Sequence, residues 1–200
     1  MNEQYFENNP SSISAPRINT VEILGEKMRF VTDNGVFSKG GLDDGTRILL
    51  EALPELDGRI LDLGCGWGAI GITLAKKYPK AQIVMADVNT RALELAKQSC
   101  GLNNVINAQA VESDVYSGIE GTFDYIVTNP PIRAGKQVIY AMFDGAKERL
   151  NKGGKLYIVI RKQQGAPSAQ KHLEETYDEV RLIAKEKSYW ILESGDINAD

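Results

Sequence analysis

Apolar and polar positions follow two different periods along most of this chain. From residue 59 onward, short apolar runs alternate with longer stretches in which apolar residues recur every three or four positions. Runs of the first kind predict buried strands, and stretches of the second kind predict amphipathic helices. The predicted strands cover residues 59–63, 81–86, 106–111, 123–128, 155–160, 180–184 and 189–192. The predicted helices cover residues 69–77, 90–100, 134–150 and 168–177, and one more begins near residue 43.

Strands that alternate with helices predict an α/β fold of the Rossmann-like kind, a parallel sheet with helices on both faces. The last two strands are separated only by residues 185–188. Because a parallel crossover needs roughly a dozen residues or more, these two strands cannot both be parallel. We therefore expect a mostly parallel sheet that closes with one antiparallel strand.

The N-terminal part follows a different pattern. Residues 1–18 are polar and without period, so we expect a flexible tail there. Residues 21–24 and 28–31 then predict a β-hairpin with its turn at Gly25-Glu26. We accordingly expect one domain over residues 19–200, in which residues 19–42 form the hairpin and the lead-in to the sheet.

Composition is that of an ordinary globular domain, with 42% hydrophobic and 25% charged residues in 200. No apolar run approaches the ~20 residues of a membrane span, and the polar start at residues 1–4 is unlike a signal peptide. We expect a cytoplasmic protein without membrane contact. The two cysteines, Cys65 and Cys100, have no metal-ligand spacing, so we expect free thiols and no metal.

Charge is distributed unevenly. The net charge of -4 disfavours a general nucleic-acid binder. Residues 129–165, however, contain eight Lys or Arg against two acidic residues, which gives this segment +6 and the remainder -10.

A glycine-rich loop follows the strand at 59–63. Gly64, Gly66 and Gly68 there permit positive φ angles and close approach of a ligand to the backbone. The same spacing fits a dinucleotide fingerprint, so the loop alone does not separate NAD from S-adenosylmethionine. Asp87, at the end of the next strand, can bind ribose hydroxyls in either case.

Two further carboxylates favour S-adenosylmethionine. Asp62 precedes the loop, where it would repel a pyrophosphate but suits the ammonium and sulfonium charges of the methyl donor. Asp114 ends the third strand, where it can accept a hydrogen bond from the adenine amino group. In open α/β sheets, ligands bind at these carboxyl ends of the strands.

The segment Asn129-Pro130-Pro131-Ile132 follows the strand at 123–128. The Asn129 side-chain oxygen and the Pro130 carbonyl can accept both hydrogens of a planar amino group, which favours a pyramidal, nucleophilic nitrogen. Proline fixes its own backbone and restricts the residue before it, so these acceptors are pre-aligned. The pattern predicts methyl transfer to an amino nitrogen.

These motifs resemble those of the class I S-adenosylmethionine-dependent methyltransferases, in particular the small-domain group related to ribosomal RNA small-subunit methyltransferase C, a guanine-N2 methyltransferase. The resemblance covers roughly residues 20–194 and includes the segments 35–39, 42–46, 133–136 and 162–166. It implies a seven-stranded sheet whose seventh strand is antiparallel. It also implies a cofactor site, which we expect at Asp62, Gly64, Cys65, Gly66, Gly68, Asp87, Val88, Asp114, Val115 and Asn129.

The substrate implied is RNA, either ribosomal RNA or a ribosomal particle, bound by a monomer or homodimer. Candidate substrate contacts are Phe37, Arg133, Lys136, Lys162 and Gln163. Ile132 stands where many relatives have an aromatic residue that stacks on the target base. Three alternatives stay open: methylation of a glutamine amide in protein, an NAD-dependent oxidoreductase, and a non-catalytic RNA-binding domain.

Overall fold

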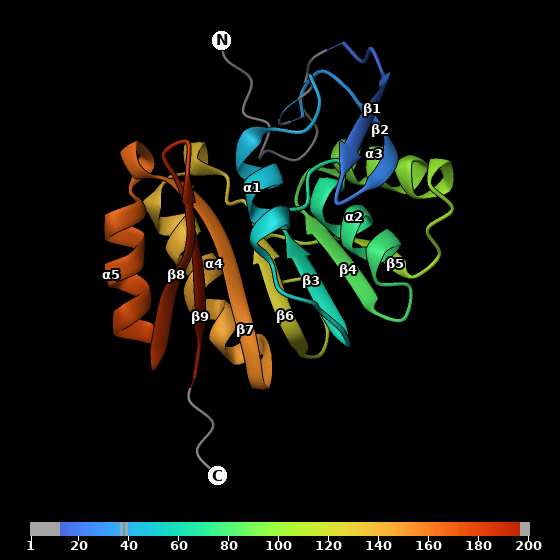
Figure 1. The fold of residues 1–200 in the computed structure, drawn as a ribbon. Coiled ribbons are helices and arrows are strands. Elements are labelled where there is room, and N and C mark those ends of the chain that lie inside the picture. Colours follow the sequence, from blue (N-terminus) through green and yellow to red (C-terminus); the bar gives the residue numbers. More distant parts are fainter. Residues whose placement is uncertain (1–12, 37, 39, 197–200) are drawn as a thin grey trace.

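The centre of the molecule is a seven-stranded sheet with the order β5-β4-β3-β6-β7-β9-β8 (Figure 1). The computed structural model describes residues 13–36, 38 and 40–196. The strands are β3 (Arg59–Leu63), β4 (Gln82–Asp87), β5 (Ala108–Glu112), β6 (Phe123–Thr128), β7 (Leu150–Arg161), β8 (Glu179–Glu186) and β9 (Tyr189–Gly195). Strand β9 is antiparallel to both neighbours, and the other pairings are parallel. The predicted fold class is confirmed.

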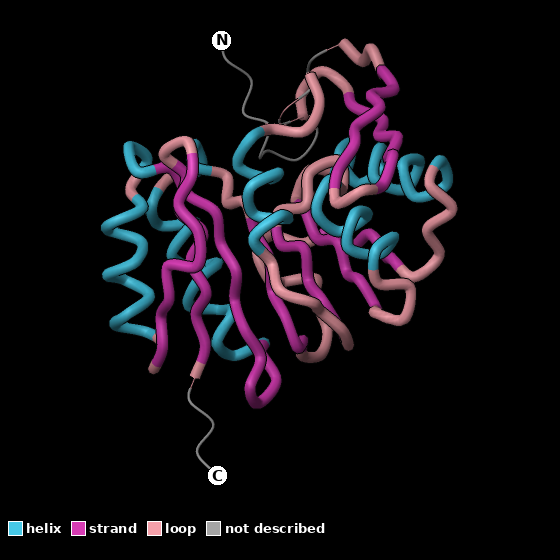
Figure 2. Tube along the Cα trace, in the orientation of Figure 1, coloured by secondary structure: helices cyan, strands magenta, loops and turns pink. Residues whose placement is uncertain are grey.

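Helices cover both faces of this sheet (Figures 1 and 2). One face carries α1 (Asp44–Ala52), α2 (Ala69–Lys77) and α3 (Thr90–Leu102). The other carries α4 (Lys136–Arg149) and α5 (Ala166–Thr176). Two short 3-10 turns, η1 (Ile132–Ala134) and η2 (Lys162–Gln164), connect β6 to α4 and β7 to α5.

The inner strands of the sheet are mostly apolar on both sides, and successive residues feed two separate cores. In β4, Ile83 and Met85 pack with α1, α2 and α3, whereas Val84 and Ala86 pack with α4 and α5. Side chains alternate across a strand with a period of two, so a continuous apolar run is required where both faces are covered. The uninterrupted apolar runs in the sequence therefore follow from the layered architecture.

The N-terminal hairpin consists of β1 (Arg17–Ile23) and β2 (Glu26–Thr32). Its turn is Leu24-Gly25, with φ angles of 52° and 79°, one residue earlier than predicted. A two-residue hairpin turn of the primed type needs positive φ at both positions, which favours this pair. Strand β1 already includes the last two residues of the predicted tail, whose residues 1–12 lie outside the described part.

Strand β2 lies along α3. The backbone N–H of Val31 donates to Ser99 Oγ at 2.9 Å, and the Asn103 amide exchanges hydrogen bonds with the backbone of Arg29 at 2.9 and 2.7 Å. Phe30 of the same strand packs on Trp67, with ring centroids 4.9 Å apart. The hairpin is thereby attached to the glycine loop that contains Trp67.

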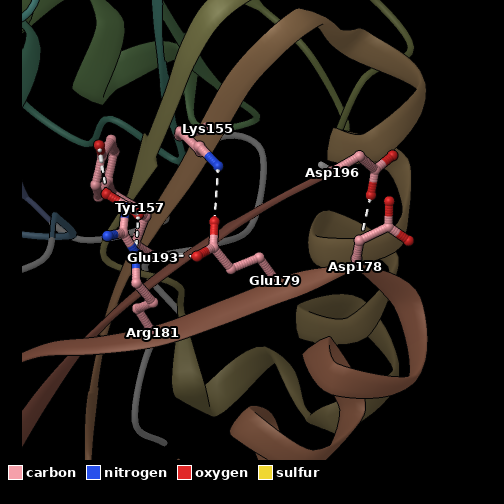
Figure 3. Close-up of polar contacts among 7 residues, drawn as sticks. All are labelled: Lys155, Tyr157, Asp178, Glu179, Arg181, Glu193 and Asp196. Atoms are coloured by element: carbon pink, nitrogen blue, oxygen red, sulfur yellow. Dashed lines mark hydrogen bonds and ion pairs between the residues drawn. The ribbon is translucent and has the colours of Figure 1, made fainter. Parts of the chain in front are cut away.

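The antiparallel edge of the sheet carries a network of charged side chains around the buried Glu193 (Figure 3). Glu193 on β9 is 8% exposed and accepts hydrogen bonds from the Tyr157 hydroxyl and from Arg181 Nε, both at 2.8 Å. Nearby, Lys155 and Glu179 form an ion pair at 3.4 Å. Burial and the hydrogen bond to Glu193 raise the pKa of Tyr157, so the tyrosine stays protonated as a donor. The network links β7, β9 and β8, the strands of the two antiparallel pairs.

Several predicted boundaries differ from the observed ones by two residues or more, and two of these errors lie at glycines. The helix predicted from residue 134 begins at Lys136, because Gly135 adopts φ 92° and ψ 162°, which no helix accommodates. The strand predicted from residue 155 begins instead at Leu150, so residues 152–154 lie inside β7, where the pairing with β6 shifts register. Gly154 packs closely there, since a Cβ at this position would lie 3.0 Å from the Asp124 carbonyl oxygen.

Candidate functional site

The predicted cofactor residues lie at the carboxyl ends of β3, β4, β5 and β6. The chain runs outward from β3 to β5 and then returns to the other side of β3 as β6, so the topology reverses between β3 and β6. Crevices form at such a switch point because the following loops diverge to opposite faces. A cavity of about 410 Å³ lies there. Its polar wall residues include Asp43, Thr46, Asp87, Ser113, Asp114 and Asn129.

The glycine loop is the floor of this cavity. Gly64, Gly66 and Gly68 have φ angles of 72°, 54° and 88°, which only glycine adopts readily. Gly66 faces open space, so its backbone is accessible to a ligand. At Gly68, by contrast, a Cβ would lie 2.6 Å from Ile72 Cδ1. One glycine thus leaves room for the ligand, and another permits the packing of α2.

Asp87 anchors the loop to the end of β4. Its two carboxylate oxygens accept hydrogen bonds from the backbone N–H groups of Gly66 at 2.7 Å and Asn89 at 2.8 Å. Burial raises the pKa of Asp87, and these bonds oppose that rise. Asp87 and the adjacent Val88 both line the cavity, where a carboxylate can accept hydrogen bonds from vicinal hydroxyls.

Asp62 lies behind the loop, in contrast to the other predicted ligands. It is fully buried and is not among the described residues that line the cavity. Oδ2 accepts from the Gly71 N–H at 2.8 Å, and Oδ1 has no hydrogen-bond partner among the described residues. Burial, with a smaller contribution from the charge of Asp87, raises the pKa of Asp62 to about 7.

Asp114 and Val115 form the far wall of the cavity, after β5. Val115 has a φ of 51°, a conformation that β-branched residues avoid. The turn is held by Ser113, whose hydroxyl donates to the Val115 carbonyl at 2.9 Å and accepts from the Gly118 N–H at 3.0 Å. Strained backbone of this kind concentrates at binding sites.

Asn129 is oriented by the first turn of α1. Its Nδ2 donates to Thr46 Oγ1 at 2.9 Å and lies 3.4 Å from Asp43 Oδ1. A carboxylate only accepts hydrogen bonds, so the amide nitrogen must face Asp43, and the amide oxygen is left to accept from another group. Sequence reasoning assigned no site role to Asp43 or Thr46, because they precede the sheet by many residues.

A second cavity of about 570 Å³ opens beside the first. Val36, Asp43, Asn129 and Pro130 line both cavities. The other described residues around the second cavity are Ser38, Gly40, Ile132, Arg133, Arg161, Gln164 and Tyr189. The Asn-Pro segment therefore lies at the boundary between two spaces.

The predicted substrate residues are only partly brought together here. Arg133 lines the second cavity, whereas the described lining does not include Lys136, Lys162 or Gln163. Arg161 and Gln164 are present instead, one position before and one after the predicted pair. Lys136 lies over the Tyr140 ring at 4.9 Å. Phe37 lies outside the described residues.

Both cysteines lie within the described part of the chain. Cys65 and Cys100 are free thiols, and burial raises the pKa of both. No group of His, Cys, Asp or Glu side chains among the described residues has the arrangement of a metal site. No helix within residues 13–36, 38 and 40–196 is long and apolar enough to span a membrane.

The fold and this site define an S-adenosylmethionine-dependent methyltransferase. The model of the methyltransferase small domain family matches residues 27–193, and the chain belongs to this family. The uncharacterized protein YbxB of Bacillus subtilis (strain 168) is 42% identical over 198 residues, which are 97% of this chain and 98% of that protein.

Two relatives with named activities match as well. Ribosomal RNA small subunit methyltransferase C of Actinobacillus pleuropneumoniae serotype 7 (strain AP76) is 37% identical over 161 residues, 77% of this chain and 48% of that protein. The solved structure of the T. thermophilus 16S rRNA N2 G1207 methyltransferase, in complex with AdoMet and guanosine, matches with a TM-score of 0.83 and 31% identity. This match covers 92% of this chain and 52% of the T. thermophilus chain. The chain thus spans about half the length of these rRNA methyltransferases.

Proposed function

We propose that this protein transfers a methyl group to the exocyclic amino group of a base in RNA, with guanine N2 of ribosomal RNA as the target. The observation that carries the proposal is the meeting of two cavities at Asn129 and Pro130. One cavity would hold the methyl donor and the other the target base. A nitrogen placed between them is within reach of both.

Asn129 and Pro130 would hold the target amine. The Asn129 amide nitrogen is bound to Thr46, so its oxygen remains to accept one N–H. The Pro131 carbonyl already accepts from the Ala134 N–H at 2.8 Å, so the Pro130 carbonyl would accept the other. Methyl transfer from a sulfonium moves positive charge without creating more, and positioning of the nitrogen is therefore the main contribution the protein makes.

The walls of the first cavity fit S-adenosylmethionine, which supplies an electrophilic methyl group on a sulfonium sulfur. Asp87 would bind the ribose hydroxyls, and Asp114 would accept from the adenine amino group. Val88 and Val115 would contact the apolar faces of the adenine. The carboxylates Asp87 and Asp114 suit a cationic ligand and disfavour the pyrophosphate of a dinucleotide.

RNA is favoured over a protein substrate by the second cavity. Arg133 and Arg161 line it, and guanidinium groups suit phosphate and base edges better than a neutral glutamine side chain. The names of the matched rRNA methyltransferases and the guanosine in the T. thermophilus structure agree with this substrate. Such a role would place the protein in the cytoplasm; its oligomeric state, monomer or homodimer, stays a prediction.

Methyl transfer into unmethylated ribosomal RNA tests the proposal. With labelled S-adenosylmethionine, we expect the wild type to label RNA and Asn129→Ala to do so roughly 100-fold more slowly. Asn19→Ala is a matched control, because Asn19 also donates its amide to a threonine hydroxyl, Thr32 at 2.7 Å, but lies in the hairpin. It should retain wild-type activity.

The same assay separates the alternatives. Cell extract from a strain deleted for this protein supplies both RNA and protein acceptors. Label found in protein rather than RNA would support glutamine methylation. RNA binding without any transfer, in single turnover, would support a non-catalytic domain. Equal rates for the wild type and Asn129→Ala would contradict the role of the Asn-Pro segment.

A further inference from the structure

Asp43 occupies a position that its role as a helix cap does not explain. It is the N-cap of α1, and its Oδ1 accepts from the Thr46 N–H at 3.1 Å. The same oxygen lies 3.4 Å from Asn129 Nδ2. Asp43 is also the one ionisable side chain among the four described residues that line both cavities. Among the described residues, both polar contacts of this carboxylate fall on Oδ1, which leaves Oδ2 to meet another group.

Methylation of an amine in this place produces a proton. The nitrogen forms a bond to the methyl carbon while the carbon–sulfur bond breaks, and the positive charge passes from sulfur to nitrogen. An exocyclic base amine that carries this charge is a strong acid, so one N–H proton must leave. The Asn129 oxygen and the Pro130 carbonyl accept hydrogen bonds, but neither is basic enough to take the proton.

We propose that the Asp43 carboxylate accepts this proton. Once the nitrogen is methylated, the N–H that faced the Asn129 oxygen turns to Oδ2 of Asp43. This N–H bond breaks, its electron pair stays on the nitrogen, and an O–H bond forms on Asp43, which later releases the proton to water. The inference rests on the proposed function. It assigns two tasks to one residue, since Asp43 orients the amide that holds the amine and receives the proton that the amine loses.

Asp43→Asn separates these tasks. Asparagine caps helices as well as aspartate does and can still accept from Thr46, but it cannot take a proton. We expect kcat for RNA to fall roughly 100-fold or more, with KM for RNA unchanged. Affinity for S-adenosylhomocysteine by calorimetry and the thermal unfolding midpoint should also be unchanged. Asp44→Asn is the matched control, because Asp44 pairs with Lys187 at 3.2 Å and is not among the described residues lining either cavity.

Chemical rescue gives a result that a purely structural role of Asp43 would not produce. Asp43→Gly keeps most of the cap, because glycine is among the residues that helix N-caps accept, and it leaves room for a small acid. Added formate should restore methyl transfer to Asp43→Gly and leave the wild type unchanged. Wild-type kcat in Asp43→Asn, or no rescue by formate, overturns the proposal. A wild type that methylates no RNA overturns the proposed function, and this inference with it.

Discussion

At the scale of single residues, Asp62 shows the cost of a carboxyl group in the core. Its pKa is raised to about 7 by burial, whereas the unfolded chain ionises near 3.8. Below pH 4 both states hold the proton. Between pH 4 and pH 7 the folded state keeps the proton on Asp62 and the unfolded state has lost it. The free energy of unfolding therefore falls as pH rises through this range.

Asp62→Asn removes this dependence, because an amide oxygen can still accept from the Gly71 N–H but never ionises. At pH 8 we expect the free energy of unfolding, measured by urea unfolding, to be higher for the variant than for the wild type, by up to about 4 kcal/mol. At pH 4 the two proteins should be nearly equal. Asp57→Asn, at an exposed position, is the control and should show no such pH-dependent difference. A difference that stays constant between pH 4 and pH 8 would show that the pKa of Asp62 is not raised in the folded protein.

At the scale of elements, the packing of α2 against α3 depends on a glycine between them. Gly68→Ala would place a Cβ 2.6 Å from Ile72 Cδ1 and 3.1 Å from Ala96 Cβ, at a φ of 88°. We expect a loss of at least about 2 kcal/mol in unfolding free energy. Gly101→Ala, on α3, meets no atom within 4 Å and should instead stabilise by roughly 0.5–1 kcal/mol. Urea unfolding of both variants checks the signs, and equal effects would contradict the packing argument.

Elements with a clear period could be predicted to the residue, as for β3, α2 and β6. These elements end where the apolar pattern changes or near Pro79, and both signals can be read from the local sequence. Two of the errors arose at Gly135 and at residues 152–154, where the backbone follows the surrounding packing. A glycine permits several conformations, and only the tertiary contacts select one.

At the scale of the whole molecule, part of the site could be predicted from the sequence and part could not. The rule that ligands bind at strand ends predicted the positions of Asp87, Asp114 and Asn129 on the cavity wall. It could not predict the partners of Asn129, because Asp43 and Thr46 come from a helix more than 80 positions earlier in the chain. For Asp62 the rule gave the right strand, but the pleat turns its side chain into the core.

The distribution of charge over the whole molecule gives the last prediction. Outside residues 129–165 the chain carries -10, so the RNA binding proposed above would depend on the +6 segment. Arg133 lines the second cavity and belongs to that segment. We expect Arg133→Ala to weaken RNA binding and to reduce the slope of log affinity against log salt by roughly 0.7. Its affinity for S-adenosylhomocysteine should not change. Lys97→Ala removes the same charge from an ion pair with Glu94 on α3 and should leave the slope unaltered. If both variants shift the slope equally, RNA responds only to total charge, and the second cavity is not where the backbone passes.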